Sequence, residues 1–249
     1  MNLFDSHIHL QRLNPPHHFD AAVKWALVPA ITRDDWEPLL HNYGHTDGRY
    51  IALGVHPEYA EQWNQQAATQ LEQLVKHPRV VAIGEVGLDS NYADDLQQQV
   101  LRQQIKIALT ADKALILHCY KRYAALLDIL HEEQAHLIGG IVHGYTGSLE
   151  IALQLWQLGF VIGIGRTILN PHARRIRATV KALPDAAYVI ESDAPWPAHI
   201  LEHHPDMNQG AGALLSIAAQ IAELRGQSLE QVACISANNA QRILHIESK

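Results

Sequence analysis

The sequence contains few cysteines, which limits how its fold can be stabilised. Only Cys119 and Cys234 occur among 249 residues. Two thiols are too few for the disulfide framework that holds small secreted domains together. We therefore expect a protein of a reducing compartment, stabilised by a hydrophobic core. The chain is long enough to bury such a core, and 47% of its residues are hydrophobic.

Long apolar runs are also absent. No stretch approaches the roughly 18 consecutive apolar residues that a membrane-spanning helix needs. The segment MNLFDSHIHL has no basic region followed by an apolar one, so it does not resemble a signal peptide. These absences predict a soluble, cytoplasmic protein without membrane contact.

Positive charge is scarce as well. The sequence has 19 Lys and Arg against 26 Asp and Glu, giving a formal net charge of -7. This balance argues against a broad basic surface that grips nucleic acid through many phosphates, but a small site can still hold a few. No linker, charge run or low-complexity tract divides the chain, so we expect one domain over residues 1–249. Nothing in the sequence indicates an obligate protein partner.

What the sequence does contain is an alternation of short apolar runs with longer amphipathic stretches. The runs are rich in Val, Ile and Leu, which is typical of parallel strands buried on both faces. The eight predicted strands are Leu3–Asp5, Trp25–Ala30, Tyr50–Val55, Val80–Glu85, Ala114–His118, Ile138–His143, Phe160–Gly165 and Tyr188–Asp193. Eight strands alternating with helices predict an α/β fold, a TIM (β/α)8 barrel.

The stretches between the runs are predicted to be helices. In Leu96–Thr110 the apolar residues recur every three or four positions, with glutamines on the opposite face. Further helices are expected at Arg122–Glu133, at Ser148–Leu158, after Pro171 as a first-turn residue, and as two or three helices from Gly212 to Ile246. A cap at Ser228 or Ser236 would divide this last stretch, and the crossover from Pro29 to Arg49 carries the weakest helix pattern.

Ionisable side chains stand at the ends of most predicted strands. In a barrel of this kind the active site lies at the C-terminal ends of the strands. Six residues there are potential metal ligands: His7, His9, Glu85, His118, His143 and Asp193. His7 and His9 are two residues apart, so an extended strand directs both imidazoles to the same side.

This donor set predicts a site for two divalent metal ions. Imidazole and carboxylate without thiolate suit Zn or Mn, or Mg where water completes the coordination. Six donors exceed the roughly three protein ligands of a single open catalytic site. They suit two ions about 3.5–4 Å apart that share one carboxylate and activate water for hydrolysis of a phosphate ester, an ester or an amide.

The order of motifs resembles the TatD family of metal-dependent deoxyribonucleases, part of the amidohydrolase superfamily. The segments that carry the resemblance are DSHIHL, GVHP, VVAIGEVGLD, LILHC, HGYTGSLE and ESDAP, between Asp5 and about Asn239. The resemblance implies that His7 and His9 bind a first metal ion, and that His118 and His143 bind a second. It implies that Glu85 bridges the ions.

The resemblance also assigns roles around the ions. It makes Asp193 a ligand and the acceptor of the nucleophile's proton, so that Asp193 and Glu85 are the catalytic carboxylates. Asp89 and Glu191 match positions whose side chains orient ligands by hydrogen bonds. His56 in GVHP matches a substrate contact, although a structural histidine packed before Pro57 explains it equally well.

Two departures from the family pattern concern the substrate. Where the family often has an arginine two residues after the fifth-strand histidine, this chain has Tyr120, followed by Lys121 and Arg122. Arg166 can supply a phosphate contact in its place, or it can be a solvated loop residue. We therefore take His56, Tyr120 and Arg166 as the candidate substrate-binding residues. The segment WPAHILEHHPDMNQ lacks the proline that the family usually has after Asn208.

Cys119 stands beside His118, a position that could suggest a nucleophile. The alternation of a strand turns neighbouring side chains to opposite faces, so we expect Cys119 to pack away from the site.

Three functions compete for this ligand set. The first is a deoxyribonuclease or phosphodiesterase of the 3′–5′ exonuclease type, acting on DNA. The second is a hydrolase of carbonyl substrates such as a lactone, an amide or a D-aminoacyl-tRNA ester. The third is a binding or scaffold protein that keeps the barrel, which the complete ligand set disfavours.

Overall fold

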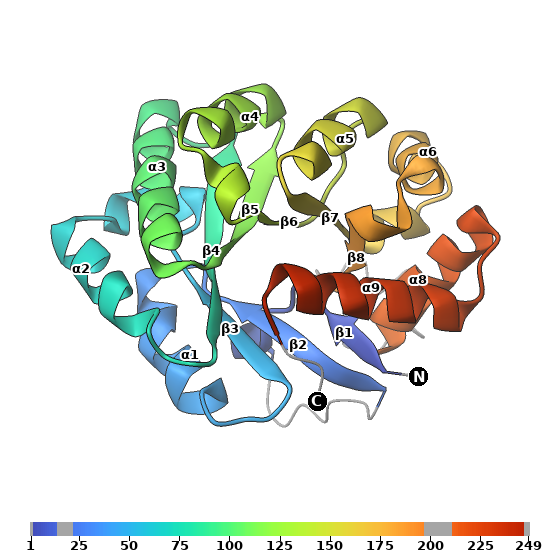
Figure 1. Ribbon diagram of the computed structural model, residues 1–249, viewed down its shortest axis with the longest axis horizontal. Coiled ribbons are helices and arrows are strands. Elements are labelled where there is room, and N and C mark those ends of the chain that lie inside the picture. The colour runs from blue at the N-terminus through green and yellow to red at the C-terminus, as the bar shows by residue number, and fades with distance from the viewer. Residues whose placement is uncertain (1, 14–21, 197–210, 247–249) are drawn as a thin grey trace.

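Eight parallel strands form the centre of the molecule, as the sequence predicts. The computed structural model describes residues 2–13, 22–196 and 211–246. The strands pair in the order β1-β2-β3-β4-β5-β6-β7-β8. Their bounds are β1 Leu3–Asp5, β2 Val23–Pro29, β3 Arg49–Leu53, β4 Val80–Asp89, β5 Ala114–Tyr120, β6 Gly140–Val142, β7 Phe160–Ile164 and β8 Tyr188–Ile190. This is the predicted TIM barrel (Figure 1).

Hydrogen bonds just beyond the strand ends join the last strand to the first. The backbone N–H of Ser6 donates to the carbonyl of Ile190 over 3.1 Å. In the other direction, the N–H of Ser192 donates to Oδ1 of Asp5 over 2.9 Å. These bonds close the ring on the side where the segments after β1 and β8 lie together.

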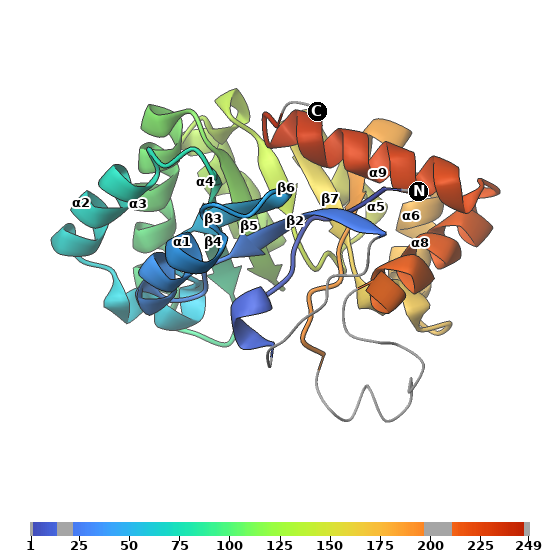
Figure 2. The same cartoon turned by 90° about the horizontal axis from the view of Figure 1, so that it is seen from below.

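Helices surround the barrel. They are α1 Trp36–Tyr43, α2 Gln65–Leu74, α3 Asp94–Ala111, α4 Tyr123–Glu132, α5 Leu149–Gln157, α6 Arg174–Ala182, α8 Ala211–Arg225 and α9 Leu229–Ile243. Short 3₁₀ turns lie at η1 Leu10–Arg12, η2 Arg33–Asp35, η3 Pro57–Gln62, η4 Ala135–Leu137, η5 Arg166–Leu169 and η6 Asp185–Ala187. Figure 2 shows α9 crossing one end of the strands, near the N-terminus. In the described ranges, no helix combines the length and the hydropathy required to cross a bilayer.

Alternate residues of each strand face two separate hydrophobic clusters. In β2, Ala26 and Val28 pack in the cluster beneath the helices, whereas Leu27 packs in the barrel interior. Interior residues include Phe4, Ala52, Ala82, Ile116, Ile141, Val161 and Val189. Ala237, Ala240 and Ile243 of α9 join them, so this helix closes the end of the barrel opposite the strand tips. The rim that carries the predicted ligands thereby rests on a packed interior.

Several predicted helix boundaries are confirmed by their caps. The Ser148 hydroxyl accepts a hydrogen bond from the N–H of Ile151 at the start of α5. Ser228 forms a capping box with Gln231 at the start of α9. Ser236 is instead a buried residue inside α9, where its hydroxyl accepts a bond from the N–H of Ile190 over 2.8 Å.

Several sequence-based expectations differ from the structure. Strand β8 ends at Ile190, three residues before the predicted end at Asp193, and β6 spans only Gly140–Val142 of the predicted Ile138–His143. Helix α6 begins at Arg174, so the prediction of Pro171 in its first turn is wrong; residues 171 and 172 form a turn before it. Strand β4 continues to Asp89, four residues beyond the predicted end at Glu85, because Val86 to Asp89 pair with β5. The glutamines of α3 do not all face solvent.

Two buried glutamines of α3 hold the strand tips in place. The Gln97 amide accepts a hydrogen bond from the N–H of Asp89 over 2.7 Å and donates to the carbonyl of Asp89 over 3.0 Å. The Gln104 amide makes the same pair of bonds with Val55, the residue before His56. These two side chains fix the backbone from which site residues project.

Candidate metal centre

The six predicted ligands converge at the C-terminal ends of the strands. His7 and His9 follow β1, Glu85 lies within β4, His118 lies within β5 and His143 follows β6. Asp193 follows β8 by three residues and adopts a left-handed backbone with φ 50°. Its N–H donates to the carbonyl of His7 over 2.9 Å, which ties the segment after β8 to the segment after β1.

Glu85 lies at the centre of the cluster, and its two oxygens face different histidines. Its Oε1 lies 3.1 Å from Nε2 of His7 and 3.0 Å from Nε2 of His9. Its Oε2 lies 2.9 Å from Nε2 of His143 and 3.9 Å from Nδ1 of His118. The carboxylate is 3% exposed, so this central position is screened from water. One carboxylate thus separates the histidines into the two pairs expected from the sequence.

Asp193 lies at the open side of the cluster. Its Oδ1 is 3.7 Å from Nε2 of His9 and 4.0 Å from Nε2 of His7. The side chain is 32% exposed, in contrast to the buried Glu85. Asp193 is therefore the carboxylate that both contacts the cluster and meets solvent.

The pKa values of His7, His118 and Glu85 are shifted toward their metal-ligating forms. Burial lowers the pKa of His7 to about 4, with His143 contributing. Burial also lowers the pKa of His118. Burial alone would raise the pKa of Glu85, but the neighbouring His143 and His7 hold it well below the usual range. Histidine binds metal through a neutral ring and glutamate through its carboxylate, so these shifts favour the ligating forms.

The pKa values of two imidazoles are shifted in the opposite direction. Although burial opposes this shift, the hydrogen bond to Glu85 and the charge of Glu85 raise the pKa of His9. Although burial favours neutral His143, the charge of Glu85 and their hydrogen bond raise the pKa of His143 to about 9. His7 and His143 stack with ring centroids 3.9 Å apart, so both rings cannot be cationic at once.

The donor atoms fit divalent ions. Within three groups, the ligand atoms lie no more than 4.8 Å apart: His7 with His9 and Glu85, His7 with His143 and Asp193, and His56 with Glu85 and His118. The Nδ1 atoms of His7 and His143 are buried without a hydrogen-bond partner in the described part of the chain. Nitrogen and oxygen donors without thiolate are the set that Zn, Mn and related ions accept.

Two further carboxylates lie behind the ligands. Oδ2 of Asp89 is 3.0 Å from Nε2 of His118, the ring nitrogen that faces away from Glu85. Glu191 is fully buried and accepts a hydrogen bond from the N–H of Gly144, next to His143. Burial raises the pKa of Glu191 to about 8. Asp89 is thus placed to orient the His118 ring, whereas Glu191 fixes the backbone next to His143.

The structure adds one residue that the sequence did not single out. Asp5 is buried, and its Oδ1 accepts bonds from the N–H groups of Ser192 and His7. Burial raises the pKa of Asp5 to about 7. Asp5 therefore joins the segments that carry His7 and Asp193. The DSHIH motif contains this signal, because a strand-end aspartate is costly to bury without such partners.

The three candidate substrate contacts lie in different surroundings. His56 belongs to the cluster: its Nε2 is 4.0 Å from Oε2 of Glu85, while its Nδ1 accepts a bond from the N–H of Glu58. Tyr120 is exposed at the end of β5. Arg166 is half-buried at the start of η5 after β7, with no carboxylate within ion-pair distance among the described residues. Most of the divergent segment after ESDAP, residues 197–209, lies outside the described residues.

Cys119 packs away from the cluster. It is 7% exposed and belongs to the hydrophobic layer beneath the helices, as the strand alternation predicts. Burial raises the pKa of its thiol to about 12, so this sulfur is not a nucleophile.

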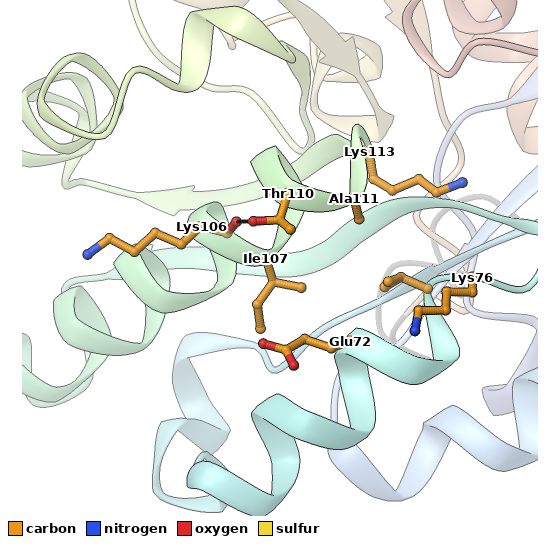
Figure 3. A pocket seen from close by; sticks show the side chains of 8 residues that line it. Glu72, Lys76, Lys106, Ile107, Thr110, Ala111 and Lys113 are labelled. Atoms are coloured by element: carbon orange, nitrogen blue, oxygen red, sulfur yellow. Dashed lines mark hydrogen bonds between the residues drawn. The ribbon is translucent and has the colours of Figure 1, made fainter.

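The volume of a cavity does not identify this site. A cavity of about 710 Å³ lies outside the barrel between α2 and α3, with Glu72, Lys76 and Lys113 on its walls (Figure 3). None of the converging histidines lines it. The convergence of ligand atoms at the strand tips, where barrel enzymes place their chemistry, identifies the site instead.

Comparison with known proteins gives a consistent result. A family model described as TatD related DNase matches residues 4–245. YabD of Bacillus subtilis, named an uncharacterized metal-dependent hydrolase, is 30% identical over 262 residues, covering 98% of this chain and 99% of its own. A protein of Erwinia tasmaniensis named 3'-5' ssDNA/RNA exonuclease TatD is 30% identical over 208 residues, covering 81% and 80%. The crystal structure of the TatD homologue YjjV from Escherichia coli superposes with a TM-score of 0.83 at 29% identity over 98% of both chains.

Proposed function

Since the chain belongs to the TatD family of metal-dependent hydrolases, we propose that it is a 3′–5′ exonuclease that cleaves single-stranded DNA with two divalent ions. The observation that carries the proposal is the position of Glu85. One of its oxygens faces His7 and His9, and the other faces His143 and His118. A single carboxylate between two histidine pairs is the arrangement that two ions sharing a ligand require.

In this proposal His7, His9 and Asp193 hold one ion and His118 and His143 hold the other, with Glu85 shared. The ions, whether Mg, Mn or Zn, would supply positive charge for the scissile phosphate and lower the pKa of the attacking water. Asp193 is 32% exposed and its Oδ1 lies 3.7 Å from Nε2 of His9, so this carboxylate would be placed to accept the proton of the attacking water. Asp89 keeps the His118 ring oriented through Nε2.

The cations at the mouth favour a substrate that carries phosphates over a lactone or an amide. Arg166 follows β7 and Lys121 follows β5, and neither forms an ion pair with a carboxylate of the described ranges. A lactone or an amide offers these cations no negative charge, whereas each nucleotide offers one. These cations support a substrate that carries phosphates, a class that includes DNA and also the ester of an aminoacyl-tRNA. The two free cysteines agree with a cytoplasmic enzyme.

The test is release of acid-soluble nucleotides from 3′-labelled single-stranded DNA. The protein is stripped of metal and then supplied with Mg, Mn or Zn. We expect metal-dependent release by the wild type and its loss in Glu85→Ala, which lacks the shared ligand. Glu72→Ala, an exposed glutamate of α2, is the matched control and keeps full activity. Release that persists in Glu85→Ala contradicts the two-ion proposal.

A negative result with DNA is also informative. If folded, metal-loaded protein releases no nucleotide but hydrolyses a lactone or an aminoacyl ester, the exonuclease proposal is wrong. Metal content, measured by elemental analysis of the wild type and of Glu85→Ala, tests the ligand set separately. We expect two ions per chain in the wild type and a lower content in the variant.

A further inference from the structure

A cavity of about 590 Å³ lies between the segments that follow His118 and His143. Its walls come from the segments after β5 and β6, together with the start of α6. Tyr120 and Lys121 follow His118 by two and three residues, and Thr146 follows His143 by three. Two of its walls therefore belong to the segments that carry the histidines proposed for the second ion. Its volume lies within the roughly 300–1,000 Å³ typical of small-ligand sites.

The walls are held in place by one hydrogen bond between the two segments and one within the segment after β6. The Tyr123 hydroxyl accepts a bond from the N–H of Thr146 over 3.3 Å. The Tyr145 hydroxyl donates to the carbonyl of Ser148 over 2.6 Å. These tyrosines use their hydroxyl groups within the protein. The cavity is thus a shaped feature of the fold and not a gap between loose loops.

One aromatic ring and two cations remain available to a ligand. Tyr120 is 38% exposed. Lys121 adopts a left-handed backbone with φ 56°, and its Nζ lies 4.8 Å from the centroid of the Tyr120 ring. Arg175 joins from the exposed side of α6. Neither cation has a carboxylate within 4.0 Å in the part of the chain that the structure describes.

This combination matches the chemistry of an unpaired nucleotide. Single-stranded nucleic acid binds where aromatic side chains stack on bases while nearby cations hold the phosphates. In a duplex, each base already stacks on its neighbours and is paired, so its face is not free. With a net charge of -7, the protein gives no general attraction to nucleic acid, and local cations matter more.

We propose that this cavity, the tyrosine cavity, is a nucleotide subsite adjacent to the scissile bond. One base of the single strand stacks on Tyr120, and Lys121 and Arg175 hold the phosphate next to it. The subsite rests on the proposed exonuclease function and sets its preference for single strands. The family often has an arginine at the position of Tyr120. In this chain the tyrosine ring offers a surface for stacking there.

Stacking is tested by removing one base or the ring. Single-stranded oligonucleotides carry one abasic residue at each of the last positions before the labelled 3′ end. At one position we expect the missing base to raise KM about 10-fold for the wild type, as loss of base–aromatic stacking does. Tyr120→Ala raises KM similarly for the intact strand and shows no further loss with that abasic strand. Tyr120→Phe keeps the ring and restores the wild-type pattern.

Phosphate binding is tested by salt dependence. Removal of one cation that binds a phosphate should reduce the slope of log kcat/KM against log salt concentration by roughly 0.7 for a single strand. We expect that change for Arg175→Gln and for Lys121→Asn, because asparagine tolerates a left-handed backbone. Arg174→Gln is the matched control: this exposed neighbour on α6 does not line the cavity, and its slope stays unchanged.

The outcomes separate the subsite from the function. If the wild type degrades single strands but every abasic penalty survives unchanged in Tyr120→Ala, the subsite is wrong and the exonuclease stands. An unchanged salt slope in both cation variants also overturns it. If the wild type releases no nucleotide with any metal, the function and the subsite fall together.

Discussion

Gln104→Met tests whether buried glutamines position the rim of the barrel. Gln104 lies on α3 with its amide in the core. Its Oε1 accepts a hydrogen bond from the N–H of Val55 over 2.9 Å, and its Nε2 donates to the carbonyl of Val55 over 3.2 Å. Methionine has nearly the same length and volume but neither donor nor acceptor. The substitution therefore removes both hydrogen bonds and leaves the packing filled.

The expected loss of stability comes from the backbone groups of Val55, which lose their hydrogen-bond partner. The N–H and the C=O of Val55 stay buried without their partner, and each unsatisfied group costs about 1–3 kcal/mol. Part of this cost is offset because the amide of Gln104 no longer has to leave water. We expect the free energy of unfolding to fall by about 3 kcal/mol.

Urea denaturation followed by far-ultraviolet circular dichroism measures the change. A lower midpoint at constant slope reports lost stability in a two-state transition. Gln99→Met is the matched control, since Gln99 is exposed on the same helix and the change should stay within about 0.5 kcal/mol. If Gln104→Met loses less than about 1 kcal/mol, the glutamine does not hold Val55 in the way described.

Three further predictions concern the site and the thiols. Asp193→Asn should reduce nucleotide release at saturating metal by roughly 100-fold or more, since general base catalysis typically contributes that much; equal rates would remove Asp193 from proton transfer. Adding Zn or Mn to stripped protein at about 100 times Kd should stabilise the fold by about 2.7 kcal/mol. For a chain of this size that raises Tm by about 5–10 °C in scanning calorimetry, and Glu85→Ala should abolish most of the shift. A thiol reagent should label Cys234 in the native protein and reach Cys119 only after unfolding, because Cys119 is 7% exposed; peptide mass spectrometry that finds Cys119 modified under native conditions would contradict the packing.

The barrel was predictable because strand burial leaves a local signal. Each strand is covered by helices on one side and by the barrel interior on the other, so its residues are apolar in both directions. In β2, Leu27 faces the interior and Val28 faces the helices, and both are fully buried. Strand ends depend on pairing with distant segments. The sequence could not indicate that β4 continues to Asp89, because that extension exists through bonds to β5.

Polar residues were harder to place than apolar ones. Gln97 and Gln104 lie among the other glutamines of one helix, and only the backbone groups of Asp89 and Val55 distinguish them. Asp5 was visible in the motif, but its bonds to Ser192 and His7 depend on the meeting of the first and last strands. The six potential ligands were predictable because each follows a strong strand signal, and parallel strands end at the same rim.

The two ends of the barrel contribute differently to the protein. One end contributes to its stability, and the other carries the potential metal ligands. At one end α9 closes an interior of Phe4, Ile116 and their neighbours, and this apolar packing contributes stability without any bound group. At the other end Glu85 and four histidines are crowded within hydrogen-bonding distance, where buried charge opposes folding unless a cation compensates it. Removing Glu85 alone should therefore destabilise the metal-free protein, because the histidines that surround it would stay buried without their partner.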